Sequence, residues 1–156
     1  MKKFCPGFSL VELLIAASIL GLLTTFGLAR FHQFNRRQIF DQAVQELKNN
    51  LRFAQEKALA GEKPSDWCTA GHLQGYQLKF NTSSNYLIEA ICSDDEISAR
   101  QVKSIPLLDP VSGPIDEASV LFKVLAQGVD EEKTFTLSFT GMDDKSVTVT
   151  KTGEIK

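Results

Sequence analysis

Hydrophobic residues are concentrated near the start of the chain, in residues 8–29, where Glu12 is the only charged side chain. A helix of this length, with a rise of ~1.5 Å per residue, would span about 33 Å and match the ~30 Å hydrocarbon core of a bilayer. A secretory signal peptide has a shorter apolar region followed by a small-x-small cleavage site, and this segment fits neither feature. The pattern therefore predicts a transmembrane or assembly helix over residues 8–29.

Beyond residue 29 the pattern changes from uniformly apolar to amphipathic. Apolar residues recur at intervals of three and four positions, at Phe40, Val44, Leu47, Leu51, Ala54 and Ala58. This period predicts a helix with one apolar stripe, and Gly61 and Pro64 are predicted to end it. We expect the stripe in residues 30–61 to pack on a sheet, with a coiled-coil seam as the alternative. One continuous helix is then expected from Phe8 to about Ala60.

The remainder of the chain, residues 62–156, contains segments in which apolar and polar residues alternate, and this alternation predicts strands. The strands are expected at residues 76–80, 86–90, 119–125, 135–139 and 147–149. Residues 105–114 hold prolines and a glycine and are predicted to form a loop. A long helix followed by a run of strands predicts an α+β fold, with the helix lying across a mostly antiparallel sheet.

The sequence shows no group of side chains typical of an active site or a metal site. The formal net charge of -2 does not favour bulk binding of nucleic acid. His32 and His72 lack the spacing of metal ligands and are expected to be solvated. The acidic runs at residues 94–96 and 130–132 lack the spacing of calcium ligands and are expected to be turns. We therefore predict no enzyme, no cofactor and no metal ion, and we assign no role to Trp67.

Glu12 is unusual because it lies in an otherwise apolar helix. An ionised carboxylate near the centre of a bilayer costs ~2.5–3.5 kcal/mol, and less near an interface, so a simple anchor has no reason to carry one. Acidic side chains inside membranes usually have a partner. The position of Glu12 therefore predicts a cation within its reach in the functional state.

A short motif surrounds Glu12. The chain reads Gly7-Phe8-Ser9-Leu10-Val11-Glu12 after a short leader that contains two lysines. This segment resembles the processing site of type IV prepilins and type II secretion pseudopilins. The resemblance implies a pilin fold, cleavage of the leader 1–7 between Gly7 and Phe8, and N-methylation of the new amine on Phe8 by a prepilin peptidase/N-methyltransferase. It also implies that Glu12 pairs with the N-terminal amine of a neighbouring subunit. The proline usual in the helices of this family is absent, and Ala29 stands near its place.

The same resemblance implies where the protein lies and what it contacts. A single-pass position in the inner membrane is expected, with residues 62–156 as a globular head in the periplasm or outside the cell. Assembly with other pilin or pseudopilin subunits into a type IV pilus or a type II secretion pseudopilus would follow. The order of segments in the head resembles the minor pilins and the H-type minor pseudopilin of type II secretion systems, so a structural minor subunit is the expected function, with a major pilin as the alternative. The sequence does not distinguish among pilus, secretion and competence systems.

Two alternative functions stay open on the sequence. A competence-type minor pilin would bind DNA, and Lys145, Lys151 and Lys156 are the candidate contacts, although acidic residues are interspersed among them. Its DNA binding would weaken steeply with salt. An uncleaved, membrane-anchored periplasmic protein would instead keep Met1.

The chain has three cysteines, Cys5, Cys68 and Cys92. Cleavage of the leader would remove Cys5 and leave an even number. Disulfides persist outside the cytoplasm, where the resemblance places the head, so we expect Cys68 and Cys92 to form a disulfide. The alternative is three unrelated buried thiols, since unpaired cysteine packs well in protein cores.

Overall fold

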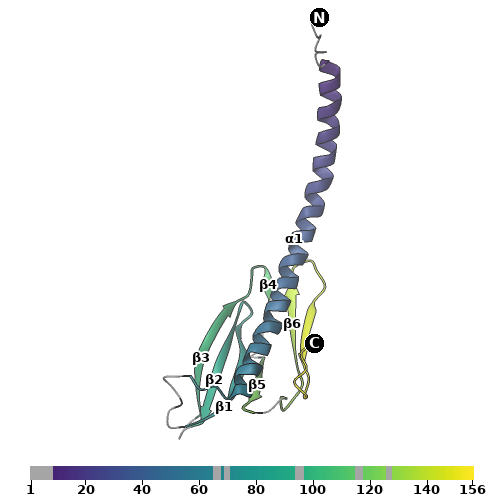
Figure 1. The fold of residues 1–156 in the computed structure, drawn as a ribbon. Coiled ribbons are helices and arrows are strands. Elements are labelled where there is room, and N and C mark those ends of the chain that lie inside the picture. Colours follow the sequence, from purple (N-terminus) through teal and green to yellow (C-terminus); the bar gives the residue numbers. More distant parts are fainter. Residues whose placement is uncertain (1–8, 65–67, 69–70, 94–96, 115–117, 126–127) are drawn as a thin grey trace, which may run out of the picture. The chain divides into compact units, whose positions relative to one another are not determined.

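Figure 1 shows a computed structural model of the protein. The structure describes residues 9–64, 68, 71–93, 97–114, 118–125 and 128–156, except for the side chains of residues 25–30 and 97. The chain divides into two compact units, Met1–Gln38 and Ile39–Lys156, and each is described by itself.

A single helix, α1 (Leu10–Ala60), contributes to both units. It ends where Gly61 adopts a left-handed backbone conformation with φ of 59°. The Gly61 amide donates to the Ala58 carbonyl at 3.1 Å, and the Glu62 amide donates to the Lys57 carbonyl at 3.3 Å. This pair of bonds is a Schellman motif, which satisfies carbonyl groups left open at the helix end. The predicted stop at Gly61 therefore has a defined geometry.

The second unit contains two antiparallel sheets. The larger has the strand order β3-β2-β1-β5. Its strands are β1 (His72–Thr82), β2 (Asn85–Ser93), β3 (Ile97–Pro106) and β5 (Ser119–Lys123). The smaller has the order β4-β6-β7. Its strands are β4 (Val111–Ser112), β6 (Lys133–Phe139) and β7 (Lys145–Val149). The chain end returns to β7, where Thr148 and Lys156 exchange backbone hydrogen bonds of 3.2 and 3.0 Å.

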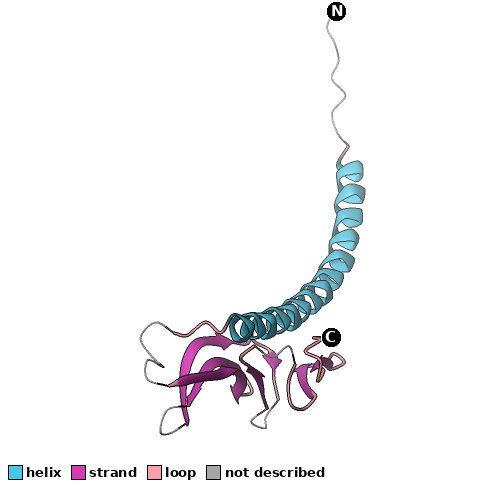
Figure 2. Cartoon of the chain, turned by 60° about the horizontal axis from the view of Figure 1, so that its bottom comes forward, coloured by secondary structure: helices cyan, strands magenta, loops and turns pink. Residues whose placement is uncertain are grey.

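The C-terminal part of α1, from residue 39, lies across the sheets, and Figure 2 shows this layer in cyan over the magenta strands. All six residues of the predicted apolar stripe are buried: Phe40, Val44, Leu47, Leu51, Ala54 and Ala58. Burial of a large aliphatic side chain such as Leu47 or Leu51 contributes ~1.5–3 kcal/mol. The ring of Phe40 lies 5.7 Å from that of Phe139 on β6, and the ring of Phe80 on β1 lies 5.6 Å from that of Phe135. One core therefore joins the helix to both sheets.

The predicted α+β fold, with a helix on antiparallel sheets, is confirmed. The predicted loop at residues 105–114 is wrong in part, because β3 runs through Pro106 and β4 lies at Val111–Ser112. Proline lacks a backbone donor but is tolerated on an edge strand, and β3 is at the edge of its sheet. Residues 97–104 of β3 were not predicted as a strand. His72, expected to be solvated, is exposed and is the first residue of β1.

Candidate assembly segment

Glu12 lies in the first turn of α1, which begins directly after Ser9. The Leu13 amide donates to the Ser9 carbonyl at 3.1 Å, which begins the helical hydrogen bonding. Glu12 stands three residues after Ser9, the spacing of a capping box. An acidic side chain in the first turn also interacts favourably with the helix dipole. The predicted cleavage site, Gly7 and Phe8, lies outside the described residues, as do the leader and Cys5.

The carboxylate of Glu12 is available for an intermolecular partner. Glu12 is exposed. Within the part of the chain that the structure describes, its carboxylate makes no hydrogen bond or ion pair. The interaction between the Glu12 carboxylate and the helix dipole contributes ~0.3–1 kcal/mol at an exposed site. This interaction explains only in part why an acid stands in an apolar helix.

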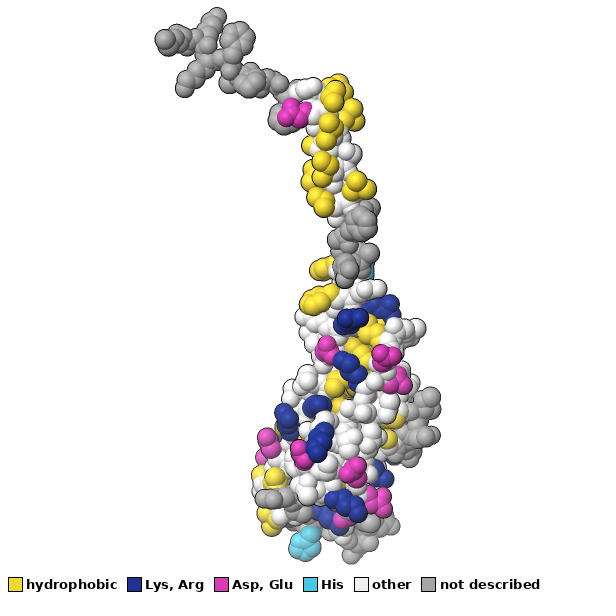
Figure 3. Space-filling model, turned by 90° about the vertical axis from the view of Figure 1, so that its right-hand side faces the viewer, with side chains coloured by type: hydrophobic (Ala, Val, Ile, Leu, Met, Phe, Trp, Pro, Cys, Tyr) yellow, Lys and Arg dark blue, Asp and Glu magenta, His cyan; other side chains and the backbone are white. Residues whose placement is uncertain are grey.

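Among the described residues of the first unit, no element covers the apolar side chains on either side of Glu12. The large apolar side chains between Leu10 and Leu23 are 52–76% exposed, and Figure 3 shows them in yellow. Polar side chains on this stretch are satisfied internally: the Ser18 hydroxyl donates to the Ile15 carbonyl at 2.8 Å, and the Thr24 hydroxyl donates to the Gly21 carbonyl at 2.9 Å. Such bonds let hydroxyl groups face apolar surroundings without an unsatisfied donor.

Across the helical residues that the structure describes, no stretch is both long enough and apolar enough to cross a membrane.

The second unit has a disulfide between Cys68 and Cys92, with Cα atoms 5.9 Å apart. Both cysteines are buried, and the bond joins the segment after α1 to the end of β2. The same segment is held by the Tyr76 hydroxyl, which donates to the Glu62 carbonyl at 2.6 Å. Burial raises the pKa of Tyr76, and the nearby Glu62 charge raises it further.

A buried polar chain that sequence reasoning missed connects α1 to β2 and β3. The side-chain amide of Asn50 donates to the Tyr86 hydroxyl at 2.8 Å, and the Lys103 ammonium donates to the Asn50 side-chain carbonyl at 3.0 Å. Tyr86 is fully buried, and this burial raises the pKa of its hydroxyl far above the ordinary value. The only hint in the sequence is a polar Asn50 directly before Leu51 of the apolar stripe.

The lysines considered for DNA binding have acidic neighbours in the structure. The Lys145 ammonium contacts the Asp41 carboxylate on α1, and Lys156 forms an ion pair of 3.1 Å with Glu154. Lys151 is exposed near the chain end. Figure 3 shows basic and acidic side chains interspersed over the visible face of this unit. These contacts reduce the positive potential that nucleic acid would meet.

The two histidines belong to different units. His32 and His72 are both exposed. Among the described residues, no group of three or more His, Cys, Asp or Glu side chains could hold a metal ion. Trp67 and the acidic run at residues 94–96 lie outside the described part.

A known protein family has a model that matches the N-terminal motif. Residues 2–28 match the family model described as the prokaryotic N-terminal methylation motif. The search of curated proteins returned no match, and neither did the search of solved structures. The motif implies processing by a prepilin peptidase and assembly with other pilins, and its family is structural and not enzymatic. The motif, together with a helix that packs on antiparallel sheets, supports a type IV pilin-like protein.

Proposed function

We propose that the protein is a structural pilin or pseudopilin subunit, cleaved after Gly7, methylated on Phe8 and assembled through the first part of α1. The observation that carries this proposal is the methylation-motif match at residues 2–28. The exposed apolar surface between Leu10 and Leu23 supports it, because water-exposed apolar surface on this scale marks a site that contacts other molecules.

The first part of α1 serves two environments in turn under this proposal. In the inner membrane its apolar side chains contact lipid, with the second unit in the periplasm. In the filament the same side chains pack against those of neighbouring subunits. The internally bonded Ser18 and Thr24 suit both environments because their donors need no water.

Glu12 supplies the specific contact. Cleavage creates a positive amine at Phe8, and the amine of one subunit pairs with the Glu12 carboxylate of the next. Pairing offsets the burial of both charges in an apolar filament core, whereas either charge buried alone is costly. This contact sets how far one helix is displaced along the other.

We further propose a minor subunit of a type IV pilus or a type II secretion pseudopilus. The support is the order of segments in the second unit, which resembles the minor pilins and the H-type minor pseudopilin. The DNA-binding alternative loses support from the ion pairs at Lys145 and Lys156.

Intact mass of the full chain, isolated from membranes of the native host, tests the proposal. The expected mass lacks residues 1–7 and includes one added methyl group. A chain that retains Met1 would refute the proposal and favour an uncleaved membrane anchor. A strain that lacks the prepilin peptidase is the control, and it should accumulate the full-length precursor.

A further inference from the structure

The larger sheet ends at β5, and one side of this strand has no neighbouring strand in the described part of the chain. β5 pairs with β1 through alternate residues, beginning with the bond of 3.0 Å that the Phe80 amide donates to the Ala118 carbonyl. In an antiparallel pair the intervening residues point their backbone groups away from the partner strand. On β5 these residues are Ser119, Leu121 and Lys123. Their amide and carbonyl groups therefore have no backbone partner among the described residues.

The smaller sheet leaves one side of β6 open in the same way. Thr148 of β7 exchanges backbone hydrogen bonds with Lys156, so the alternate residues of β7 bind β6. The same alternation directs the backbone groups of Thr134 and Thr136 on β6 away from β7. β4 covers this side of β6 only at the end of the strand. The backbone groups of Thr134 and Thr136 therefore also lack a partner within the part of the chain that the structure describes.

A cleft of about 310 Å³ lies between β5 and the start of β6. Residues 119–121 of β5 form one wall, and residues 129–131 form the other together with Lys133, the first residue of β6. β5 and β6 belong to different sheets and do not pair with each other. This space is called the β5–β6 cleft below, and it separates two strand edges that lack backbone partners.

The wall opposite β5 is fixed by the C-terminal part of the chain. The Val129 amide donates to the Lys151 carbonyl at 3.2 Å. Gly128 allows this close contact, because a Cβ atom there would lie 1.9 Å from the same carbonyl oxygen. The two walls are joined by an ion pair of 2.8 Å between Lys123 on β5 and Asp130. Both of these side chains are exposed, so the pair holds the walls together only weakly.

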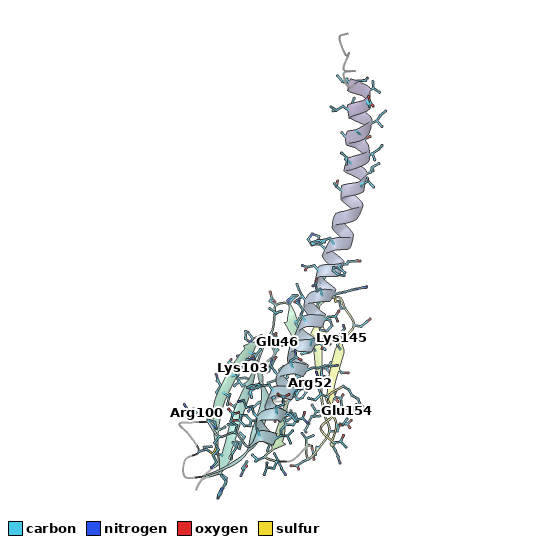
Figure 4. All side chains as sticks on the ribbon, viewed as in Figure 1. Glu46, Arg52, Arg100, Lys103, Lys145 and Glu154 are labelled. Carbon is cyan, nitrogen blue, oxygen red and sulfur yellow. A yellow bond between two sulfur atoms is a disulfide. The ribbon has the colours of Figure 1, made fainter. Side chains whose placement is uncertain are left out.

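The other outer edges of the two sheets are protected. β3 has a bulge in its pairing with β2, and Figure 4 shows two cations on this strand, Arg100 and Lys103. The free side of β7 is covered by the end of the chain, where the Thr150 amide donates to the Glu154 carbonyl at 2.9 Å. Bulges, charged side chains and covering segments all keep an edge strand from pairing with another chain. β5 has no bulge in its pairing with β1 and contains no proline, so its edge can accept a further strand.

We propose that the β5–β6 cleft binds an extended segment of a different polypeptide, which pairs with β5 as an added strand. The open groups of Ser119, Leu121 and Lys123 present amides and carbonyls at the spacing of a strand, and an extended backbone supplies partners at that spacing. A compact small molecule would leave part of this row unpaired. The binding goes beyond assembly through α1, and the partner is recognised by its unfolded, strand-forming chain.

The cleft also determines which peptides fit. Val120 on β5 and Phe135 on β6 are buried in the core that α1 covers. Successive side chains of a strand point to opposite faces, so an added strand would place every second side chain beside this core. Gln77 and Leu121, which line the cleft from the other face of the sheet, are only partly buried. The bound segment therefore alternates apolar side chains, on the side of α1, with polar ones.

Binding of a designed peptide to the full-length protein in detergent micelles tests the inference. The probe is a fluorescently labelled peptide in which valine and threonine alternate, with lysine at each end for solubility. Fluorescence anisotropy measures its affinity, and amide hydrogen exchange locates it. We expect saturable binding that slows exchange at the amides of Ser119, Leu121 and Lys123, because these donors gain partners. A peptide of the same sequence with N-methylated backbone amides should bind about tenfold more weakly, since it lacks the donors.

A pair of substitutions at Leu121 tests the edge itself. Leu121→Pro removes an amide that points away from β1, so the pairing of β5 with β1 is kept, and proline is tolerated on an edge strand. It should weaken binding about tenfold. Leu121→Thr removes the same apolar side chain but keeps the amide, and as the matched control it should bind within about threefold of wild type. Circular dichroism checks that both variants fold, and the N-methylated peptide tests the same hydrogen bonds on the unaltered protein if the proline variant does not.

The inference would be overturned by absence of binding, by equal affinity for the N-methylated peptide, or by protection from exchange that is confined to β3. Equal binding by the two folded Leu121 variants would overturn it as well. None of these results bears on cleavage after Gly7, which intact mass measures separately, so failure of the peptide site is distinguishable from failure of the proposed function.

Discussion

Replacement of Glu12 by alanine distinguishes a local role of its carboxylate from a role in assembly. Glu12 lies exposed in the first turn of α1, and its carboxylate has no partner within the described chain. A purely local role is limited to the helix dipole, ~0.3–1 kcal/mol, and alanine recovers part of this through its higher helix propensity. The largest local effect is therefore about fivefold in any equilibrium.

An assembly role predicts a much larger effect. The amine of the adjacent subunit would remain buried without its partner, which costs ~3–5 kcal/mol. This corresponds to a loss of about a hundredfold or more in the filament equilibrium. Membrane insertion should be unchanged or improved, because an ionised carboxylate is unfavourable in a bilayer. The two roles therefore differ by more than tenfold in expected incorporation.

Fractionation with an antibody against the second unit measures the difference. Processed Glu12→Ala protein should be present in membranes at the wild-type level and nearly absent from sheared filaments. Glu12→Asp, which keeps a carboxylate in the first helical turn, is the matched control and should retain more incorporation than alanine. Incorporation of the alanine variant within fivefold of wild type would refute the pairing argument.

Three further results are expected from the second unit. The variant Cys92→Ser should lose about 3 kcal/mol in free energy of unfolding, since the disulfide to Cys68 closes a loop with a separation of 24 residues; an unchanged denaturation midpoint, or two free thiols in the exported wild type, would contradict this. Asn50→Ala should cost ~1–3 kcal/mol in urea denaturation, because the buried Tyr86 hydroxyl loses its partner; a smaller loss would mean that another group satisfies that hydroxyl. Deletion of residues 1–29 should leave a soluble, folded protein, whereas deletion through the end of α1 should cause aggregation by exposing the sheet face. Equal solubility of the two products would show that α1 does not cover the sheet face.

The amino-acid sequence by itself determined the features that depend on neighbouring residues. The 3.6-residue period from Phe40 to Ala58 identified the buried face of α1, because a helix brings residues three and four apart onto one side whatever they later contact. Gly61 ended the helix because a left-handed residue is needed there and glycine adopts it without strain. The processing motif could be identified from the sequence as well, because its residues are contiguous in the chain.

Only the tertiary structure decided the features that join distant residues. β3 has no strict alternation, because Arg100 and Lys103 are exposed although they pair with buried residues of β2, and its place in the sheet depends on that pairing. The role of Asn50 depends on Tyr86 and Lys103, which only the fold brings to it. These contacts follow from the packing of strands on α1, and long-range packing of this kind leaves no periodic signal in the sequence.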